Sequence, residues 1–116
     1  MPHIVIEYAQ AIESEVNIAH LVDAVHQGAV ESGLFPDAYD IKTRALAYQH
    51  VRMGDTQDTF VHVAVRLLSG RNDEQKSKLT LGIVKHIRAL NFSVNCVTAE
   101  AVDMNRVAYA KDVVHG

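Results

Sequence analysis

The first two residues, Met1 and Pro2, form the pair with the clearest chemical potential in the sequence. An initiator methionine is ordinarily removed when the second residue is small, and its removal here would leave Pro2 with a free secondary amine. An α-amino group titrates near about 7.7 to 8, and an apolar pocket or neighbouring cations would lower that pKa. A free Pro2 amine of this kind could act as a general base near neutral pH, whereas a retained Met1 would make its nitrogen a non-basic amide. The alternative is a Met-Pro start with no catalytic role, as in many proteins.

Two arginines stand where they could bind an anion. Arg44 lies within an expected strand, and Arg71 follows Gly70 in the turn between an expected strand and a helix. A planar guanidinium binds a carboxylate through two parallel hydrogen bonds and stabilises a developing enolate oxygen. The alternative for each arginine is a solvated surface charge. Leu34-Phe35 and Phe60 are candidate apolar walls that would keep the pKa of an amine low, although Phe60 suits the hydrophobic core even better.

Motifs for other chemistries are missing. The sequence lacks GxGxxG, GxxxxGK(S/T), GxSxG and HExxH. The single cysteine, Cys96, fits a small core residue in a reducing compartment. No two of the seven histidines are spaced i, i+4, so we expect no metal site and mostly surface or structural roles for His3, His20, His26, His50, His62, His86 and His115.

Length and composition indicate one globular domain over residues 1–116, with 48% hydrophobic and 22% charged residues. A net charge of −3 argues against a nucleic-acid partner. Residues 1–41 contain no Lys or Arg, whereas the middle of the chain is rich in cations that could build a local anion site: Lys42, Arg44, Arg52, Arg66, Arg71, Lys76 and Lys78. No signal peptide is recognisable, and no stretch approaches the roughly 18 apolar residues of a membrane span, so we expect a cytoplasmic protein.

Hydrophobic periodicity predicts an α/β fold with the order β-α-β-β-α-β. Asn17 is an expected N-cap, Gly33 an expected helix stop, and Asn72 with Gln75 resembles a capping box. The expected strands cover residues 3–8, 40–50, 59–68 and 92–102; the expected helices run from 18 to the stop at 33 and from 73 to 91, with a short helix or arm over 103–114.

The two halves of the chain share this layout at an offset of about 53 to 56 residues, which suggests an internal structural duplication. Two βαβ units would then share a four-stranded sheet with both helices on one face. The other face would meet solvent or pack on further subunits.

Several ordered motifs resemble the 5-carboxymethyl-2-hydroxymuconate delta-isomerases of the tautomerase superfamily. They are Pro2-His3, Gly33-Leu34-Phe35-Pro36, Ile41-Lys42-Thr43-Arg44, Phe60-Val61-His62 and Gly70-Arg71. The resemblance extends from Pro2 to about the second helix, while the last strand and the tail match poorly. Where relatives carry Arg-Ser-Arg, this chain has Lys42-Thr43-Arg44, so one guanidinium fork is replaced by a point charge.

The resemblance implies a homotrimer with inward-facing sheets and an active site at the amino-terminal proline, near subunit boundaries. It implies a cofactor-independent tautomerase that moves a proton within a conjugated dienol or keto acid during the catabolism of aromatic compounds such as homoprotocatechuate. By position, Pro2 would be the catalytic base, and Lys42, Arg44 and Arg71 would bind a dicarboxylate or tricarboxylate substrate.

Two alternatives remain at the level of the sequence. A ferredoxin-like ligand-binding or regulatory module has the same element order with different strand connectivity, and in it Pro2 would be incidental. A tautomerase homologue that has kept the fold and lost its activity is the other.

Overall fold

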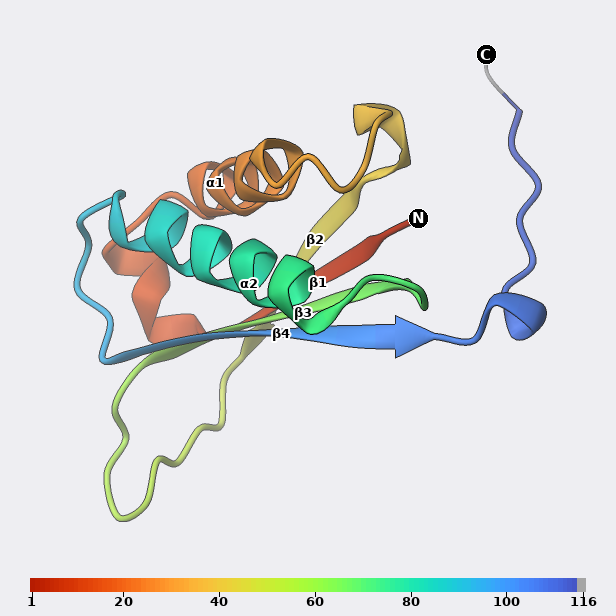
Figure 1. Cartoon of the computed structure of the whole chain (residues 1–116). Helices are drawn as coiled ribbons and strands as arrows, with labels where there is room; N and C mark the ends of the chain where they lie inside the picture. The colour runs from red at the N-terminus through yellow and green to blue at the C-terminus, as the bar shows by residue number, and fades with distance from the viewer. Residues whose placement is uncertain (115–116) are drawn as a thin grey trace.

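Four strands form one mixed sheet, and two helices cover one of its faces (Figure 1). The computed structural model describes residues 1–114, so His115 lies outside the described part. The strands and helices are β1 (His3–Ala9), α1 (Ile18–Glu31), β2 (Lys42–Tyr48), β3 (Phe60–Leu68), α2 (Asp73–Arg88) and β4 (Cys96–Met104). Short 3₁₀ turns cover Gln10–Ser14, Ala38–Asp40 and Arg106–Ala108. The expected β-α-β-β-α-β order is confirmed.

The strand order within the sheet is β2-β1-β3-β4. β1 and β2 are parallel, β3 and β4 are parallel, and β1 and β3 are antiparallel. The sheet therefore consists of two βαβ units side by side, as the internal duplication predicted. In the split βαβ unit of a ferredoxin-like module, another strand separates the parallel pair. Here the parallel strands are direct neighbours, so the ferredoxin-like alternative is wrong.

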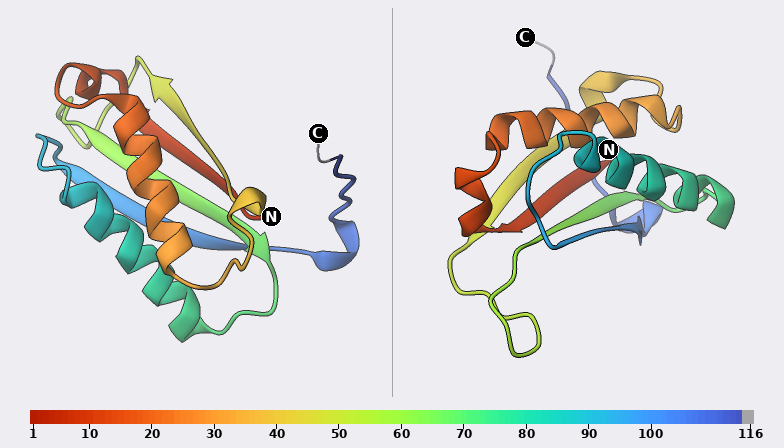
Figure 2. Two further views of the ribbon diagram at one scale, coloured as in Figure 1. Left: turned by 90° about the horizontal axis from the view of Figure 1, so that it is seen from above. Right: turned by 90° about the vertical axis from the view of Figure 1, so that its left-hand side faces the viewer.

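The helices pack side by side over the sheet (Figure 2), and the space between them and the sheet is the hydrophobic core. Core positions alternate along the strands and recur at helical spacing along α1 and α2. Fully buried side chains include Ile4, Ile6, Leu21, Val25, Val61, Val63, Val65, Leu67, Leu79, Ile83 and Ile87. Within residues 1–114, no helix is long and apolar enough to cross a membrane.

The expected helix signals are confirmed. The Asn17 side chain accepts a hydrogen bond from the Ala19 amide, and Asn72 and Gln75 form a reciprocal capping box. Gly33 follows α1 with a φ of +73°, and Asn91 follows α2 with a φ of +57°. Both residues therefore adopt the left-handed conformation that ends helices.

The expected starts of two strands are wrong. Residues 92–95 form a loop, and β4 starts only at Cys96; Phe92 and Val94 mimic a strand because they pack against the core from the loop. The second strand begins at Lys42 because Asp37 caps a 3₁₀ turn ahead of it. The segment after β4 takes the second of its two expected forms, because a 3₁₀ turn and an arm, and no α-helix, follow the strand up to residue 114; only its start is displaced, since β4 extends to Met104.

The second face of the sheet carries no helix (Figure 2). Polar contacts cross it between strands: His62 bonds the Thr98 hydroxyl at 2.7 Å and the Glu100 carboxylate at 2.6 Å, and Tyr48 donates to Glu7. The same face exposes Leu46, whose relative exposure is 54%. It therefore combines apolar side chains with an internally paired polar network.

Candidate active site

Most of the candidate functional residues lie at one edge of the sheet. β1 and β2 begin at this edge, whereas β3 and β4 end there, because β3 is antiparallel to β1 and parallel to β4. The register places His3 opposite Lys42 on β2 and opposite Arg66 on β3. We call the group at this edge the amino-terminal cluster: Met1, Pro2, His3, Asp40, Lys42, Arg44 and Arg71.

The amine at the start of the chain has an environment that favours its neutral form. Pro2 is buried, and its carbonyl oxygen accepts a hydrogen bond from the Lys42 amide at 3.1 Å. Burial lowers the pKa of the Met1 amine from 8.0 to about 6, helped by a hydrogen bond with Lys42 and by its positive charge. Lys111 also lowers this pKa, whereas Asp40 raises it. With Met1 present, the Pro2 nitrogen is an amide, and the basic group is one residue ahead of it.

Lys42 and Lys111 meet at the same acidic residue. The Lys42 Nζ donates to the backbone oxygen of Asp40 at 2.9 Å, and the Lys111 Nζ lies 3.3 Å from the Asp40 Oδ1. The bond with Lys111 holds the pKa of Asp40 below its usual value. The cluster therefore has two ammonium groups around one carboxylate.

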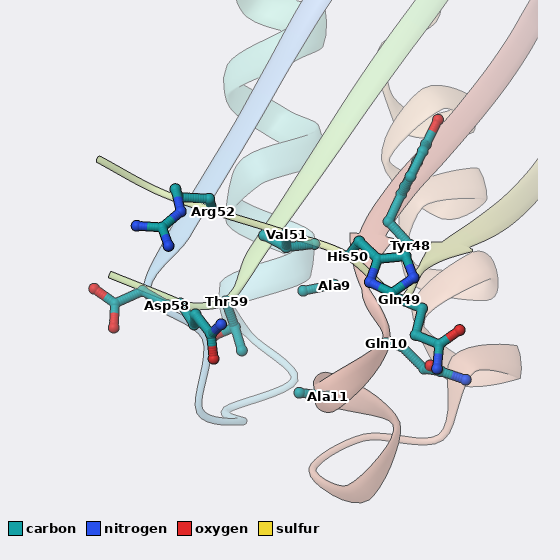
Figure 3. A pocket seen from close by; sticks show the side chains of 11 residues that line it. Ala9, Gln10, Ala11, Tyr48, Gln49, His50, Val51, Arg52, Asp58 and Thr59 are labelled. Atoms are coloured by element: carbon teal, nitrogen blue, oxygen red, sulfur yellow. The ribbon is translucent and has the colours of Figure 1, made fainter. Parts of the chain in front are cut away.

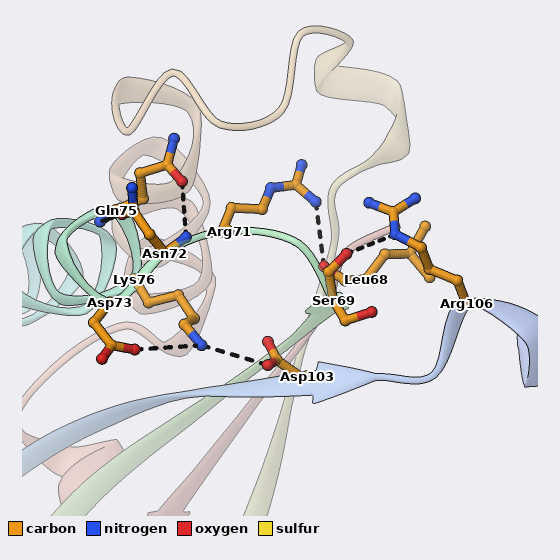
Figure 4. Close-up of polar contacts among 9 residues, drawn as sticks. All are labelled: Leu68, Ser69, Arg71, Asn72, Asp73, Gln75, Lys76, Asp103 and Arg106. Carbon is orange, nitrogen blue, oxygen red and sulfur yellow. Dashed lines mark hydrogen bonds and ion pairs between the residues drawn. The ribbon is translucent and has the colours of Figure 1, made fainter.

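Two backbone oxygens next to the cluster hold Arg71 in place, and Figure 4 shows the bond to Leu68. The Arg71 Nη2 donates to the Leu34 oxygen at 2.9 Å and its Nη1 to the Leu68 oxygen at 3.3 Å. The guanidinium carbon lies 5.4 Å from the centre of the Phe35 ring, which is almost fully buried. Because a guanidinium has five N–H donors, three remain to bind an anion. Phe35 thus packs against Arg71, and a role of Leu34-Phe35 as an apolar wall beside the amine stays a prediction.

Arg44 reaches the cluster through His3. Its Nη1 donates to the His3 Nδ1 at 3.2 Å, and the His3 Nε2 lies 3.0 Å from the Tyr109 hydroxyl. Burial, followed by the charges of Arg44 and Lys42, lowers the pKa of His3. His3 is therefore neutral, with its proton on Nε2, and it links Arg44 to the C-terminal segment.

Phe60 does not join the cluster within one protomer. It is the first residue of β3, at the opposite end of the sheet, beside a surface hollow that Glu7, Tyr48, His50 and Arg52 also line. Figure 3 shows the adjoining hollow at this end of the sheet, where Gln10, Tyr48, His50 and Asp58 line its wall. Of the seven cations expected to be able to form an anion site, Lys42, Arg44 and Arg71 belong to the cluster, and Arg52 lies at the far end of the sheet. Arg66 pairs in register with His3 on β3, whereas Lys76 and Lys78 lie on α2.

The sequence did not indicate three residues of the site: Asp40, a member of the cluster, and Tyr109 and Lys111, which contact it. Nothing in the local sequence of Tyr109 and Lys111 marks them, because they lie 106 and 71 positions from their partners His3 and Asp40. Among residues 1–114, no group of three or more His, Cys, Asp or Glu side chains could hold a metal ion.

Comparison with solved structures shows that the chain has the tautomerase fold. A fused 4-OT wild-type symmetric trimer superimposes with a TM-score of 0.75 at 19% identity, over 90% of this chain and 87% of that one. A 5-carboxymethyl-2-hydroxymuconate isomerase from Deinococcus radiodurans R1 gives a TM-score of 0.73 at 20% identity, over 96% and 88% of the two chains. No curated protein matches the chain significantly in sequence.

The family assignment comes from the sequence. The model of the 5-carboxymethyl-2-hydroxymuconate isomerase family matches residues 2–105, and the chain belongs to this family. It is accordingly an isomerase of the tautomerase type, and the fold class expected from the sequence is confirmed.

Proposed function

We propose that this isomerase converts 5-carboxymethyl-2-hydroxymuconate, or a similar unsaturated 2-hydroxy or 2-oxo acid, between its dienol and keto forms without a cofactor. The observation that carries the proposal is the gathering of the buried amino end of the chain with Lys42, Arg44 and Arg71 at one sheet edge. A polycarboxylate suits this local positive charge in a chain whose net charge is −3. Such a reaction belongs to the catabolism of aromatic compounds such as homoprotocatechuate.

Pro2 is the proposed proton carrier, with Met1 removed. The reaction takes a proton from the 2-hydroxy oxygen and returns one to a remote carbon, so one amine acts first as base and then as acid. The Pro2 nitrogen would lie one residue closer to the start of β1 than the Met1 amine, whose pKa is about 6. An amine with such a pKa is largely unprotonated at pH 7. The family match, which begins at Pro2, supports this assignment.

Arg44 and Arg71 are the proposed binding groups for the carboxylates and the 2-oxo group. The intermediate dienolate is anionic, and fixed guanidinium donors stabilise such charge without reorganising. Arg71 suits this role because its backbone anchors and Phe35 fix its position. Lys42 adds charge but lacks the bidentate fork of an arginine, so we expect it to contribute attraction rather than orientation.

The proposed assembly is a homotrimer in which the uncovered sheet face lies against other subunits. The exposed Leu46 and Tyr48 on this face, together with the symmetric trimer of the fused 4-OT, support it. In such an assembly Phe60 could wall a site only across a subunit boundary, because it lies at the other end of its own sheet. Light scattering during size exclusion checks the proposal, and a monomeric mass would contradict it.

An ultraviolet assay of dienol ketonisation tests the proposed chemistry. A small panel of hydroxymuconates with different numbers of carboxylates is offered to the parent enzyme and to Pro2→Ala. We expect the parent to prefer polycarboxylates. Pro2→Ala, which exchanges the ring-held secondary amine for a freely rotating primary amine, should lose roughly tenfold or more in kcat/KM. A Pro2→Ala enzyme as fast as the parent would overturn the proposal.

A further inference from the structure

The C-terminal arm comprises residues 105–114. All the interactions that the structure gives between this arm and the rest of the chain go to the sheet edge where the amino-terminal cluster lies. The arm leaves the end of β4 on the side of the molecule where the N-terminus lies (Figures 1 and 2). No residue of the arm is buried, and Val107 is 95% exposed, so hydrophobic packing does not place it. Polar contacts that reach this edge therefore decide its position.

Three such contacts tie the arm to three different elements. The Arg106 Nε donates to the Ser69 oxygen at 2.6 Å, just after β3 (Figure 4). The Tyr109 hydroxyl meets the His3 Nε2 on β1, and Lys111 pairs with Asp40 ahead of β2. The partners of the arm, Ser69, His3 and Asp40, lie at most two positions in the sequence from Arg71, Pro2 and Lys42. The arm therefore borders the site rather than an unrelated surface.

The pairing of Lys111 with Asp40 has an electrostatic consequence for the site. The groups that act on the amine at the chain start are Lys42, Asp40 and Lys111, while His3, which is neutral, and Arg44 complete the surroundings. An unpaired Asp40 carboxylate would repel an anionic substrate and favour the protonated amine. Lys111 pairs with that carboxylate at a distance of 3.3 Å and opposes its effect on the amine.

We propose that Lys111 is a positioning residue of the isomerase site, which neutralises Asp40 from the C-terminal arm so that the site stays cationic around its base. The inference rests on the proposed function, because it concerns the same amine and the same anionic substrate. The family match ends at residue 105, so membership in the family assigns no role to this arm.

The pH dependence of kcat/KM for 5-carboxymethyl-2-hydroxymuconate tests the role of Lys111. The acid limb of this profile reports the pKa of the base in the free enzyme. Lys111→Met removes the ammonium charge that lowers this pKa and leaves unpaired the Asp40 carboxylate that raises it. The acid limb of the profile should therefore shift to higher pH by about 0.5 to 1 pH unit. The variant should also show a severalfold higher KM at pH 7.

Three further variants separate the charge effect from a structural one. Lys111→Arg keeps the charge and should keep the parent profile, and Lys111→Met combined with Asp40→Asn should return the limb toward the parent position. Lys85→Met removes an exposed lysine in the last turn of α2, which belongs to no part of the proposed site, and should leave the profile unchanged. A Lys111→Met profile that coincides with the parent profile would overturn the role of Lys111. Full activity of Pro2→Ala would instead overturn the proposed function, so the two failures are distinguishable.

Discussion

The close approach of α1 and α2 predicts opposite outcomes for two otherwise similar substitutions. At Gly82 on α2, an added Cβ would meet nothing within 4 Å. At Gly28 on α1, it would lie 3.2 Å from the Ile83 Cα and 3.3 Å from the Ile83 Cγ1. Replacing glycine by alanine within a helix contributes about 1 kcal/mol of stability. At Gly28 that gain is opposed by overpacking, which costs about 1 to 3 kcal/mol.

We therefore expect Gly82→Ala to raise the free energy of unfolding by about 1 kcal/mol and Gly28→Ala to leave it unchanged or lower it by up to about 2 kcal/mol. The first change corresponds to an increase of roughly 3 to 6 °C in Tm for a domain of this size. Urea unfolding at one protein concentration measures both variants, which keeps any contribution of assembly equal. An equal gain from the two alanines would refute the close packing on which the helix layer rests.

Two further predictions concern a titrating contact and a binding group. The His86 Nδ1 lies 2.8 Å from the Gly82 oxygen and its Nε2 lies 3.0 Å from the Glu31 carboxylate, and these two acceptors raise the pKa of His86. The protonated His86 side chain therefore stabilises the fold fully below pH 6.5, and this stabilisation is lost as the pH rises through the raised pKa of His86. In urea unfolding, His86→Gln should accordingly lower the free energy of unfolding more at pH 6 than at pH 9. Arg71→Met should raise the KM for a polycarboxylate substrate at least tenfold in the ultraviolet assay, since a charged hydrogen bond contributes about 1.5 to 3 kcal/mol; an unchanged KM would remove Arg71 from the binding site.

Local sequence signals accounted for most of the fold. The alternation along β3 and the capping box at Asn72 depend on neighbouring residues, and both are confirmed. The start of β4 could not be predicted in the same way. Phe92 and Val94 look like strand residues because they are apolar and alternate, but their burial comes from tertiary packing of a loop.

Part of the site could also be predicted from the sequence. The residue types alone indicate the chemistry of Pro2, Arg44 and Arg71. The parallel pairing of β1 with β2 then brings Arg44 to the edge where Pro2 lies. Lys111 and Tyr109 reach that edge only because the chain returns to it after β4. Phe60 was expected near Pro2, but the nine-residue length of β3 separates it from that edge within one protomer.

The identity of the base is tested most directly by preparations that differ only at Met1. Mass spectrometry of the intact protein gives the fraction of chains that begin at Pro2, and the ultraviolet assay gives the rate of each preparation on 5-carboxymethyl-2-hydroxymuconate. If the Pro2 nitrogen carries the proton, kcat should rise in proportion to the fraction that lacks Met1 and should approach zero when every chain retains it, because an amide nitrogen is not basic. An equal kcat for chains with and without Met1 would contradict the account.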